Sequence, residues 1–294
     1  GAWVQDGQYT GADGAALDQF GVSVALSADS FVAGAVGDDV GANTDQGSAY
    51  VFARSGAAWS QAVKLVQPSG QAGSQFGLSL DLAGDDLVVG APAYDMGAVL
   101  DCGAVQSYRR VNGVWTSQLL HTAVDREAAD GFGRDVALSG NTMIIGAEND
   151  SVGPFSHCGS AYLYVRSTEF FTPRDKLIHP LAATDDRFGG AVALWGDAAV
   201  VGAPGDDIGG FVNSGSAWTF TRTGTEWMHK DTEVRAAIGT GSESLGQTLD
   251  LSGDTLVAGG GKVIERRNRA ALPAGGPVPR DTDDAMMEFD RVFQ

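Results

Sequence analysis

A pattern of residues that recurs every 56 positions constrains this 294-residue chain more than any other feature. A Phe-Gly pair begins at Phe20, Phe76, Phe132 and Phe188, and Leu245-Gly246 follows 57 residues after the last of these. A Gly-Ala pair begins 14 residues after each of the four phenylalanines. An aromatic residue marks a further register, at Trp3, Trp59, Trp115, Phe171 and Trp227. Several registers in phase indicate a tandem array of one structural unit.

Each unit has the pattern of four β-strands. Residues 20–26 alternate large and small side chains, as a strand with unlike faces does. Residues 31–36 are apolar on both faces, which predicts a buried strand. Two-residue turns such as Gly84-Asp85 separate these strands, and Gly, Asp and Asn suit tight hairpins. A third strand is expected over 48–54, and a fourth runs from the aromatic residue to about residue 65.

Tandem four-stranded sheets cover one another's faces most simply by radial repetition, so the sequence predicts an all-β, five-bladed β-propeller of antiparallel blades. A β-solenoid is the alternative, but its repeats are usually shorter. We expect a propeller domain over residues 1–267. The expected blades are about 20–66, 76–122, 132–179, 188–235 and 245–267, the last completed by residues 1–9.

The two ends of the chain carry separate expectations. The fifth copy lacks the strand that begins with Trp, whereas residues 3–8 at the N-terminus have that register. The N-terminal strand is therefore expected to complete the last blade and close the ring, which would remove two exposed edges. Residues 268–294 lie outside the repeat and are expected to be a Pro/Gly linker with a short tail. The tail, residues 281–294, is expected to be helical and to dock on a partner or on the propeller.

These residues resemble the FG-GAP repeat family. Gly90-Ala91-Pro92 and Gly202-Ala203-Pro204 match the second signature in full, and Gly34-Ala35-Val36 matches it in part. The resemblance implies a propeller like that of integrin α-subunits, an extracytoplasmic location (secreted, periplasmic or cell-surface), and a role in adhesion or ligand binding. The calcium loop of integrin repeats does not carry over, because a two-residue turn stands in its place and cannot form a chelating ring.

A ten-residue loop of constant length follows the second strand in each of the first four copies, beginning at residues 37, 93, 149 and 205. Acidic or amide side chains recur in it, at Asp39, Asp45, Asp95, Asp101, Asp207 and Asn213. Two interpretations compete: these groups hold Ca²⁺, the one cofactor considered, or they cap turns through hydrogen bonds to nearby amides. We favour turn capping.

Aromatic residues that depart from the repeat are the candidates for ligand binding. Trp195 replaces a small residue beside a hairpin turn, and Tyr94, Phe155 and Phe211 lie in the ten-residue loops. By contrast, the aromatic residues in the Trp register are expected to pack between blades. For the departing residues, covering a local patch is an equally good explanation.

Cys102 and Cys158 occupy the same register in adjacent copies. Fivefold symmetry would bring identical loop paths within disulfide distance only near the axis, about 5 Å from it. Because an exported chain with two cysteines suggests pairing, a disulfide and two free thiols are both retained, with a slight preference for the disulfide.

The net charge and the absence of catalytic motifs limit the classes of function that the sequence allows. The net charge of −18 disfavours nucleic acid and membrane surfaces as partners. The four histidines lack metal-ligand spacing with one another or with cysteine, and no hydrolase or phosphate-loop motif is present. We therefore expect no enzymatic activity, but a binding or adhesion module for a protein or glycan. The alternatives are an assembly component of a surface complex and, less favoured, a glycan-active enzyme.

Overall fold

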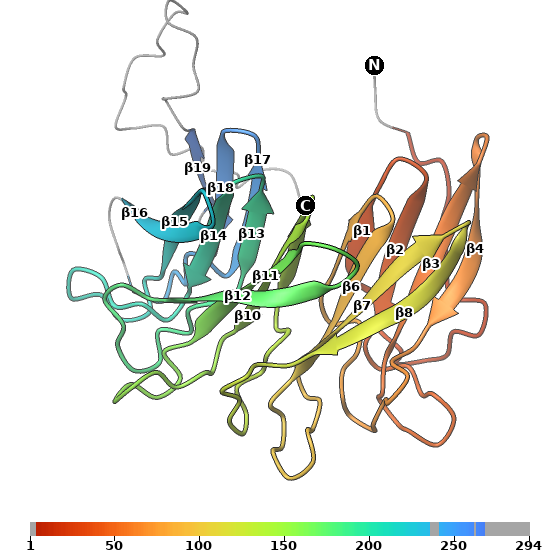
Figure 1. Cartoon of the computed structure of the whole chain (residues 1–294), viewed down its shortest axis with the longest axis horizontal. Helices are drawn as coiled ribbons and strands as arrows, with labels where there is room; N and C mark the ends of the chain where they lie inside the picture. Colours follow the sequence, from red (N-terminus) through yellow and green to blue (C-terminus); the bar gives the residue numbers. More distant parts are fainter. Residues whose placement is uncertain (1–3, 236–240, 262, 268–294) are drawn as a thin grey trace, which may run out of the picture.

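The computed structural model describes residues 4–235, 241–261 and 263–267, and these contain five antiparallel sheets arranged as the blades of a β-propeller (Figure 1). The all-β class and the five-bladed propeller predicted from the repeat are confirmed. No helix in the described part of the chain has the length and apolar character needed to cross a membrane. The predicted linker and tail at 268–294 lie outside the described residues.

The first four blades have four strands each, in sequence order from the first strand outward. Blade 1 contains β1 (Phe20–Leu26), β2 (Ser30–Ala35), β3 (Ser48–Ser55) and β4 (Ala58–Leu65). Blade 2 contains β5 (Leu80–Ala83), β6 (Asp86–Ala91), β7 (Ala104–Val111) and β8 (Val114–His121). Blade 3 contains β9 (Val136–Ser139), β10 (Thr142–Ala147), β11 (Ser160–Arg166) and β12 (Phe171–Ile178). Blade 4 contains β13 (Val192–Trp195), β14 (Ala198–Ala203), β15 (Ser216–Thr223) and β16 (Glu226–Arg235).

The fifth blade has three strands in the described residues: β17 (Thr248–Ser252), β18 (Thr255–Gly259) and β19 (Val263–Arg267). The predicted closing strand is not formed, since residues 4–8 adopt no strand. Tyr9 instead packs edge-on against Phe31 and Phe52 of blade 1, with ring centroids 5.4 and 5.7 Å apart. The aromatic cluster of blade 1 thus holds the segment that the repeat register assigns to blade 5.

Glycine allows adjacent blades to approach closely. A side chain added to Gly90 of blade 2 would collide with the backbone carbonyl of Gly133 of blade 3, and Gly34, Gly146 and Gly202 meet the next blade in the same way. The glycines of the Phe-Gly and Gly-Ala signatures therefore face each other across each of these four interfaces. The two signatures are two halves of one contact between blades.

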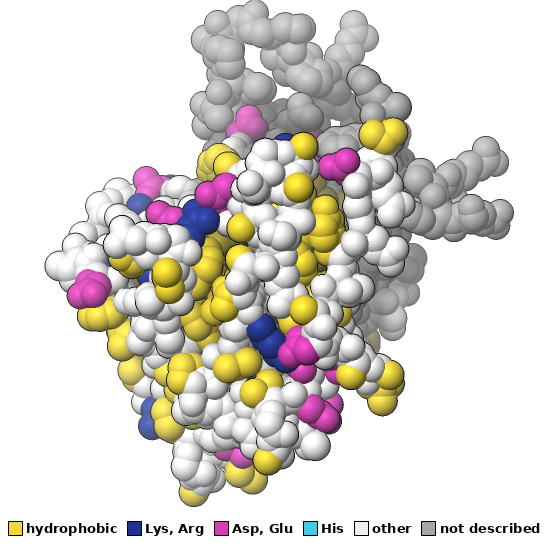
Figure 2. Space-filling model, turned by 90° about the vertical axis from the view of Figure 1, so that its right-hand side faces the viewer, with side chains coloured by type: hydrophobic (Ala, Val, Ile, Leu, Met, Phe, Trp, Pro, Cys, Tyr) yellow, Lys and Arg dark blue, Asp and Glu magenta, His cyan; other side chains and the backbone are white. Residues whose placement is uncertain are grey.

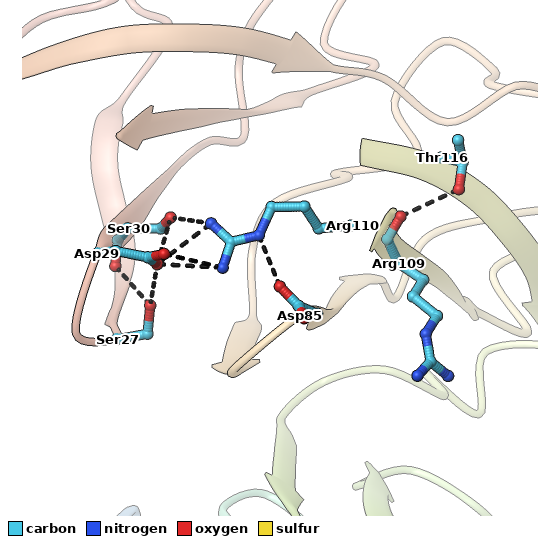
Figure 3. Close-up of polar contacts among 7 residues, drawn as sticks. All are labelled: Ser27, Asp29, Ser30, Asp85, Arg109, Arg110 and Thr116. Atoms are coloured by element: carbon cyan, nitrogen blue, oxygen red, sulfur yellow. Dashed lines mark hydrogen bonds and ion pairs between the residues drawn. The ribbon is translucent and has the colours of Figure 1, made fainter. Parts of the chain in front are cut away.

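Arginine ties the blades together farther out (Figure 3). The Arg110 side chain in blade 2 donates through Nε to Asp85 of its own hairpin at 2.7 Å, and through its terminal nitrogens to Asp29 and Ser30 of blade 1 at 3.1 and 2.9 Å. Arg166 of blade 3 reaches Asp86 of blade 2 in the same manner. Each of these guanidinium groups also stacks on the aromatic residue of the Trp register in its own blade, at 5.4 Å for Trp115 and 4.9 Å for Phe171.

The face of blade 1 that points away from blade 2 is exposed. Val24 and Leu26 of β1 are 70% and 71% exposed, whereas the corresponding Leu80 and Leu82 of β5 are 8% and 6% exposed because they pack against blade 1. Figure 2 views the molecule from the side on which blade 1 lies and shows exposed apolar side chains gathered there.

Candidate functional site

The ten-residue loops have one shared conformation. In each, an isolated bridge joins the fourth and seventh loop residues, as between Val40 and Asn43. Asp39, Asp95 and Asp207 each accept a hydrogen bond from the backbone N–H six residues later, at 2.9, 2.8 and 2.8 Å. The donating residues, Asp45, Asp101 and Asn213, have φ near 50°, a conformation that Asp and Asn tolerate better than most residues.

These contacts are those expected of turn-capping side chains. The six predicted metal-ligand residues lie at the surface or half-buried within their own loops, and the structure brings no pair from different loops into contact. The Ca²⁺ interpretation is untested by this geometry and stays a prediction.

We define the loop face as the four loop tips, residues 39–45, 95–101, 151–157 and 207–213. Phe155 and Phe211 are 38% and 43% exposed on it, and Leu100 and Val212 add further exposed apolar surface. The exposed Asp101 and Asp207 lie in the same tips. The loop face therefore combines apolar side chains with carboxylates on three successive blades.

Two other predicted aromatic contacts lie elsewhere. Trp195 is 51% exposed, but it ends β13 at the hairpin turn, at the opposite end of the blade from the loop face. Tyr94 is 5% exposed and belongs to the core between blades 1 and 2. Its hydroxyl lies 3.2 Å from that of Ser69. The interpretation of Tyr94 as a surface ligand contact is therefore wrong, because its side chain is buried between blades 1 and 2.

Partly buried ion pairs beneath the loop face were not predicted from the sequence. In blade 1, Lys64 Nζ lies 2.7 Å from both Asp13 and Asp38, and the Tyr50 hydroxyl donates to the same two carboxylates. Blade 3 repeats this network with Lys176, Asp125, Asp150 and Tyr162. Hydrogen bonds from Lys64 and Tyr50 lower the pKa of Asp13, and burial raises the pKa of Tyr50 to about 12. The sequence signal was present, because lysine and tyrosine recur two repeats apart.

The blade 1 network borders a cavity of about 320 Å³. Carboxylates dominate its lining, which comprises Asp13, Asp18, Asp38, Asp39, Asp45 and the single cation Lys64 among other residues. The cavity is acidic, but Lys64 and the capping hydrogen bonds offset part of this negative charge.

Blade 4 departs from this network. His179, Asp186 and Asp206, defined here as the blade 4 cluster, each offer one ligand atom, and these atoms lie within 4.8 Å of one another. Asp186 Oδ2 lies 3.7 Å from His179 Nδ1, and Asp206 Oδ2 lies 3.4 Å from Nε2. The side chains of His179 and Asp186 are 1% and 2% exposed. Burial raises the pKa of Asp186.

Hydrogen bonds fix the members of the blade 4 cluster. The Leu181 N–H donates to His179 Nδ1 at 3.2 Å, which leaves Nε2 directed at Asp206. Ser216 donates to Asp206 at 2.6 Å, and the Ala183 N–H donates to Asp186 at 2.5 Å. Only the spacing of histidines from one another and from cysteine was considered in the sequence, so the carboxylates of distant loops that lie beside His179 were missed.

The cysteines do not form a disulfide. Cys102 and Cys158 are free, fully buried thiols, directed at the backbone oxygens of Tyr94 and Asp150 in their own loops. The preference for a disulfide is wrong because both loops follow the same path, which keeps equivalent side chains in their separate blades.

The match to a family of known proteins has the same period as the sequence repeat. The model of the FG-GAP repeat matches residues 3–52, 59–108, 115–164 and 171–220. No curated protein matches the sequence. Among solved structures, a periplasmic gluconolactonase of Pseudomonas aeruginosa is similar, with a TM-score of 0.56 at 12% identity over 85% of this chain and 68% of that chain.

The structural comparison corrects one expectation. We excluded enzymatic activity because the sequence lacks catalytic motifs, yet a similar propeller is that of an enzyme. The exclusion is therefore wrong: this fold carries catalysis in at least one protein. At 12% identity the likeness shows the fold alone and transfers no activity to this chain.

Proposed function

Because the chain belongs to the FG-GAP repeat family, we propose that it is an extracytoplasmic binding module whose loop face captures a glycan or protein ligand. The observation that supports this most is the coincidence of exposed aromatic and acidic side chains on the loop face.

Phe155 and Phe211 supply flat apolar surface at 38% and 43% exposure, and they occupy the same register of adjacent blades. Aromatic rings bury large areas at small conformational cost, which suits them to contact the apolar face of a sugar or a side chain. Neighbouring carboxylates such as Asp101 and Asp207 accept hydrogen bonds from hydroxyl groups or attract basic side chains. A net charge of −18 agrees with a neutral or basic ligand.

The rigidity of the loops supports the same proposal. Each tip is held by its bridge and its capping hydrogen bond, so little order has to be gained on binding. The loops stand on blades whose registers are fixed by the core, which is how binding loops are usually presented.

The test is a glycan-array screen with the labelled chain, in parallel for wild type, Phe155→Ser with Phe211→Ser, and Trp195→Ser. We expect the double variant to lose at least tenfold in affinity, since each ring contributes about 1–2 kcal/mol, and Trp195→Ser to bind as wild type. A basic protein presented on the same surface tests the second ligand class. If the double variant keeps full affinity for the selected ligand, the loop face is not the binding site.

A further inference from the structure

The first and last blades present the two halves of the contact that joins neighbouring blades. At each of the four contacts within the array, an apolar residue of the second strand shares a core cluster with the first strand of the next blade. These residues are at most 2% exposed: Val32, Val88, Ile144 and Val200. Val257 has the same register in β18 of blade 5 and is 37% exposed. Blade 5 therefore offers one half of a contact, and the uncovered β1 face of blade 1 offers the other.

The glycine signature agrees with this assignment. A side chain added to the glycine of the first-strand signature would meet the backbone of the preceding blade at Gly77, Gly133, Gly189 and Gly246. At Gly21 of blade 1 the added side chain would meet nothing within 4 Å. The space that a preceding blade occupies elsewhere is thus open beside β1.

Charge at the two ends is complementary. Arg110 of blade 2 pairs with Asp29 of the preceding blade at 3.1 Å. Arg54 has the register of Arg110 in blade 1 and is exposed, whereas Asp254 has the register of Asp29 in blade 5. An ion pair of the same kind can therefore form when blade 5 lies before blade 1.

The blade 1 end also carries a strand, and the blade 5 end lacks one. The repeat units matched from residues 59, 115 and 171 each begin with the fourth strand of the preceding blade, namely β4, β8 and β12. The same segment of the first unit, residues 4–8, forms no strand, and its Val4 is 84% exposed. In the described part of blade 5, β19 pairs with β18 alone. Its Val263 is 57% exposed, whereas Ala49 of β3 is fully buried.

The chain that follows residues 4–8 is already placed as if a blade preceded it. Asp13 accepts a hydrogen bond from Tyr50 of blade 1 at 2.8 Å. Asp125, in the segment between β8 and β9, accepts one from Tyr162 of blade 3 at 2.9 Å. Residues 4–8 are thus held beside the uncovered face of blade 1. Figure 1 shows that blade 5 of the same chain lies at the other end of the array.

We propose that the blade 5 end of one copy of this chain docks on the blade 1 end of a second copy, and that residues 4–8 of the second copy add to β19 as its fourth strand. Addition of a strand to an open sheet edge is a common mode of recognition. A contact between unlike ends leaves one end of each outer copy free, so assembly can continue beyond a dimer. This association goes beyond the proposed ligand binding and does not depend on it.

Sedimentation velocity of the full chain over increasing protein concentration tests the proposal, and we expect the average mass of wild type to rise. Leu26→Glu and Val257→Glu each replace an exposed side chain, so the single chain keeps its fold, but each would bury a charge in the contact. We expect each variant alone to associate at least tenfold more weakly than wild type. An equimolar mixture is expected to form a 1:1 dimer, because each variant keeps the end that the other has lost.

Two further variants complete the test. Val114→Glu alters a side chain of β8 that is 62% exposed and lies outside both ends, so it is expected to associate as wild type does. Deletion of residues 1–8 is expected to weaken association at least tenfold without changing the urea midpoint at low protein concentration. A wild-type chain that stays monomeric, as one whose blade 5 closed on its own blade 1 would, overturns the proposal. So does a mixture of Leu26→Glu and Val257→Glu without dimer, or undiminished association after the deletion.

Discussion

At the scale of single residues, Asp135 shows the clearest effect of desolvation on a carboxylate. It is half-buried directly before β9, and its two oxygens accept the N–H groups of Val136 and Val192, at 3.0 and 2.8 Å. Desolvation raises its pKa to about 6 from 3.8, against the opposing effect of these hydrogen bonds. The native state therefore holds this proton more tightly than the unfolded state does. The contribution of Asp135 to stability is greatest below pH about 4 and falls as the pH rises to about 6.

Asp135→Asn removes this titration. Between pH 4 and pH 7, we expect the unfolding free energy of the variant to improve relative to wild type by about 2 kcal/mol, because most of the difference of roughly two pKa units, at 1.36 kcal/mol each, falls in this range. Any loss from the altered hydrogen bond is the same at both pH values, so it does not change the difference between them. Urea denaturation at both pH values measures it, with the exposed Asp207→Asn as control. Parallel pH profiles for Asp135→Asn and wild type would contradict the assignment.

At the scale of the structural element, the contact between the glycine signatures makes a specific prediction. Gly90→Ala places a methyl group against the Gly133 carbonyl of the next blade, and backbone cannot yield as a side chain can. We expect a loss of about 3 kcal/mol or more, at the upper end for overpacking. Gly259 is the matched control in blade 5, because its added methyl group meets the Thr248 side chain instead. Equal midpoints of urea unfolding for the two variants would refute this account.

The strands within a blade could be predicted from the sequence, whereas contacts between distant segments could not. The period of 56 predicted the strands and hairpins of blades 1–4, because alternation and turn glycines are local signals. The pairing of residues 3–8 with blade 5 was a non-local inference, and the local aromatic packing of Tyr9 on Phe31 and Phe52 takes precedence in the structure. The blade 4 cluster escaped prediction for a related reason: Asp206 lies 27 residues beyond His179, and the fold brings them together.

At the scale of the whole molecule, the five blades form a series whose first member has an uncovered face. Leu26 and Leu82 are the same residue type in the same register of β1 and β5, yet they are 71% and 6% exposed. Leu82 packs in the core that blades 1 and 2 share, whereas Leu26 lies on the side without a preceding blade. Arg54 reflects the same asymmetry: it stacks on Trp59 at 5.7 Å, while Arg110 in the next blade also reaches across to Asp29.

This asymmetry predicts unequal effects of one substitution at two equivalent sites. Leu82→Ala leaves a cavity between blades and is expected to cost 2–5 kcal/mol, about the usual range for a buried leucine. Leu26→Ala removes an exposed side chain and is expected to change stability by no more than about 0.5 kcal/mol. Urea unfolding of both variants at low protein concentration makes the comparison, with Leu138→Ala as a second buried reference, since Leu138 is 7% exposed. A loss for Leu26→Ala as large as for Leu82→Ala would mean that another surface covers blade 1 in solution, as ring closure by blade 5 would do.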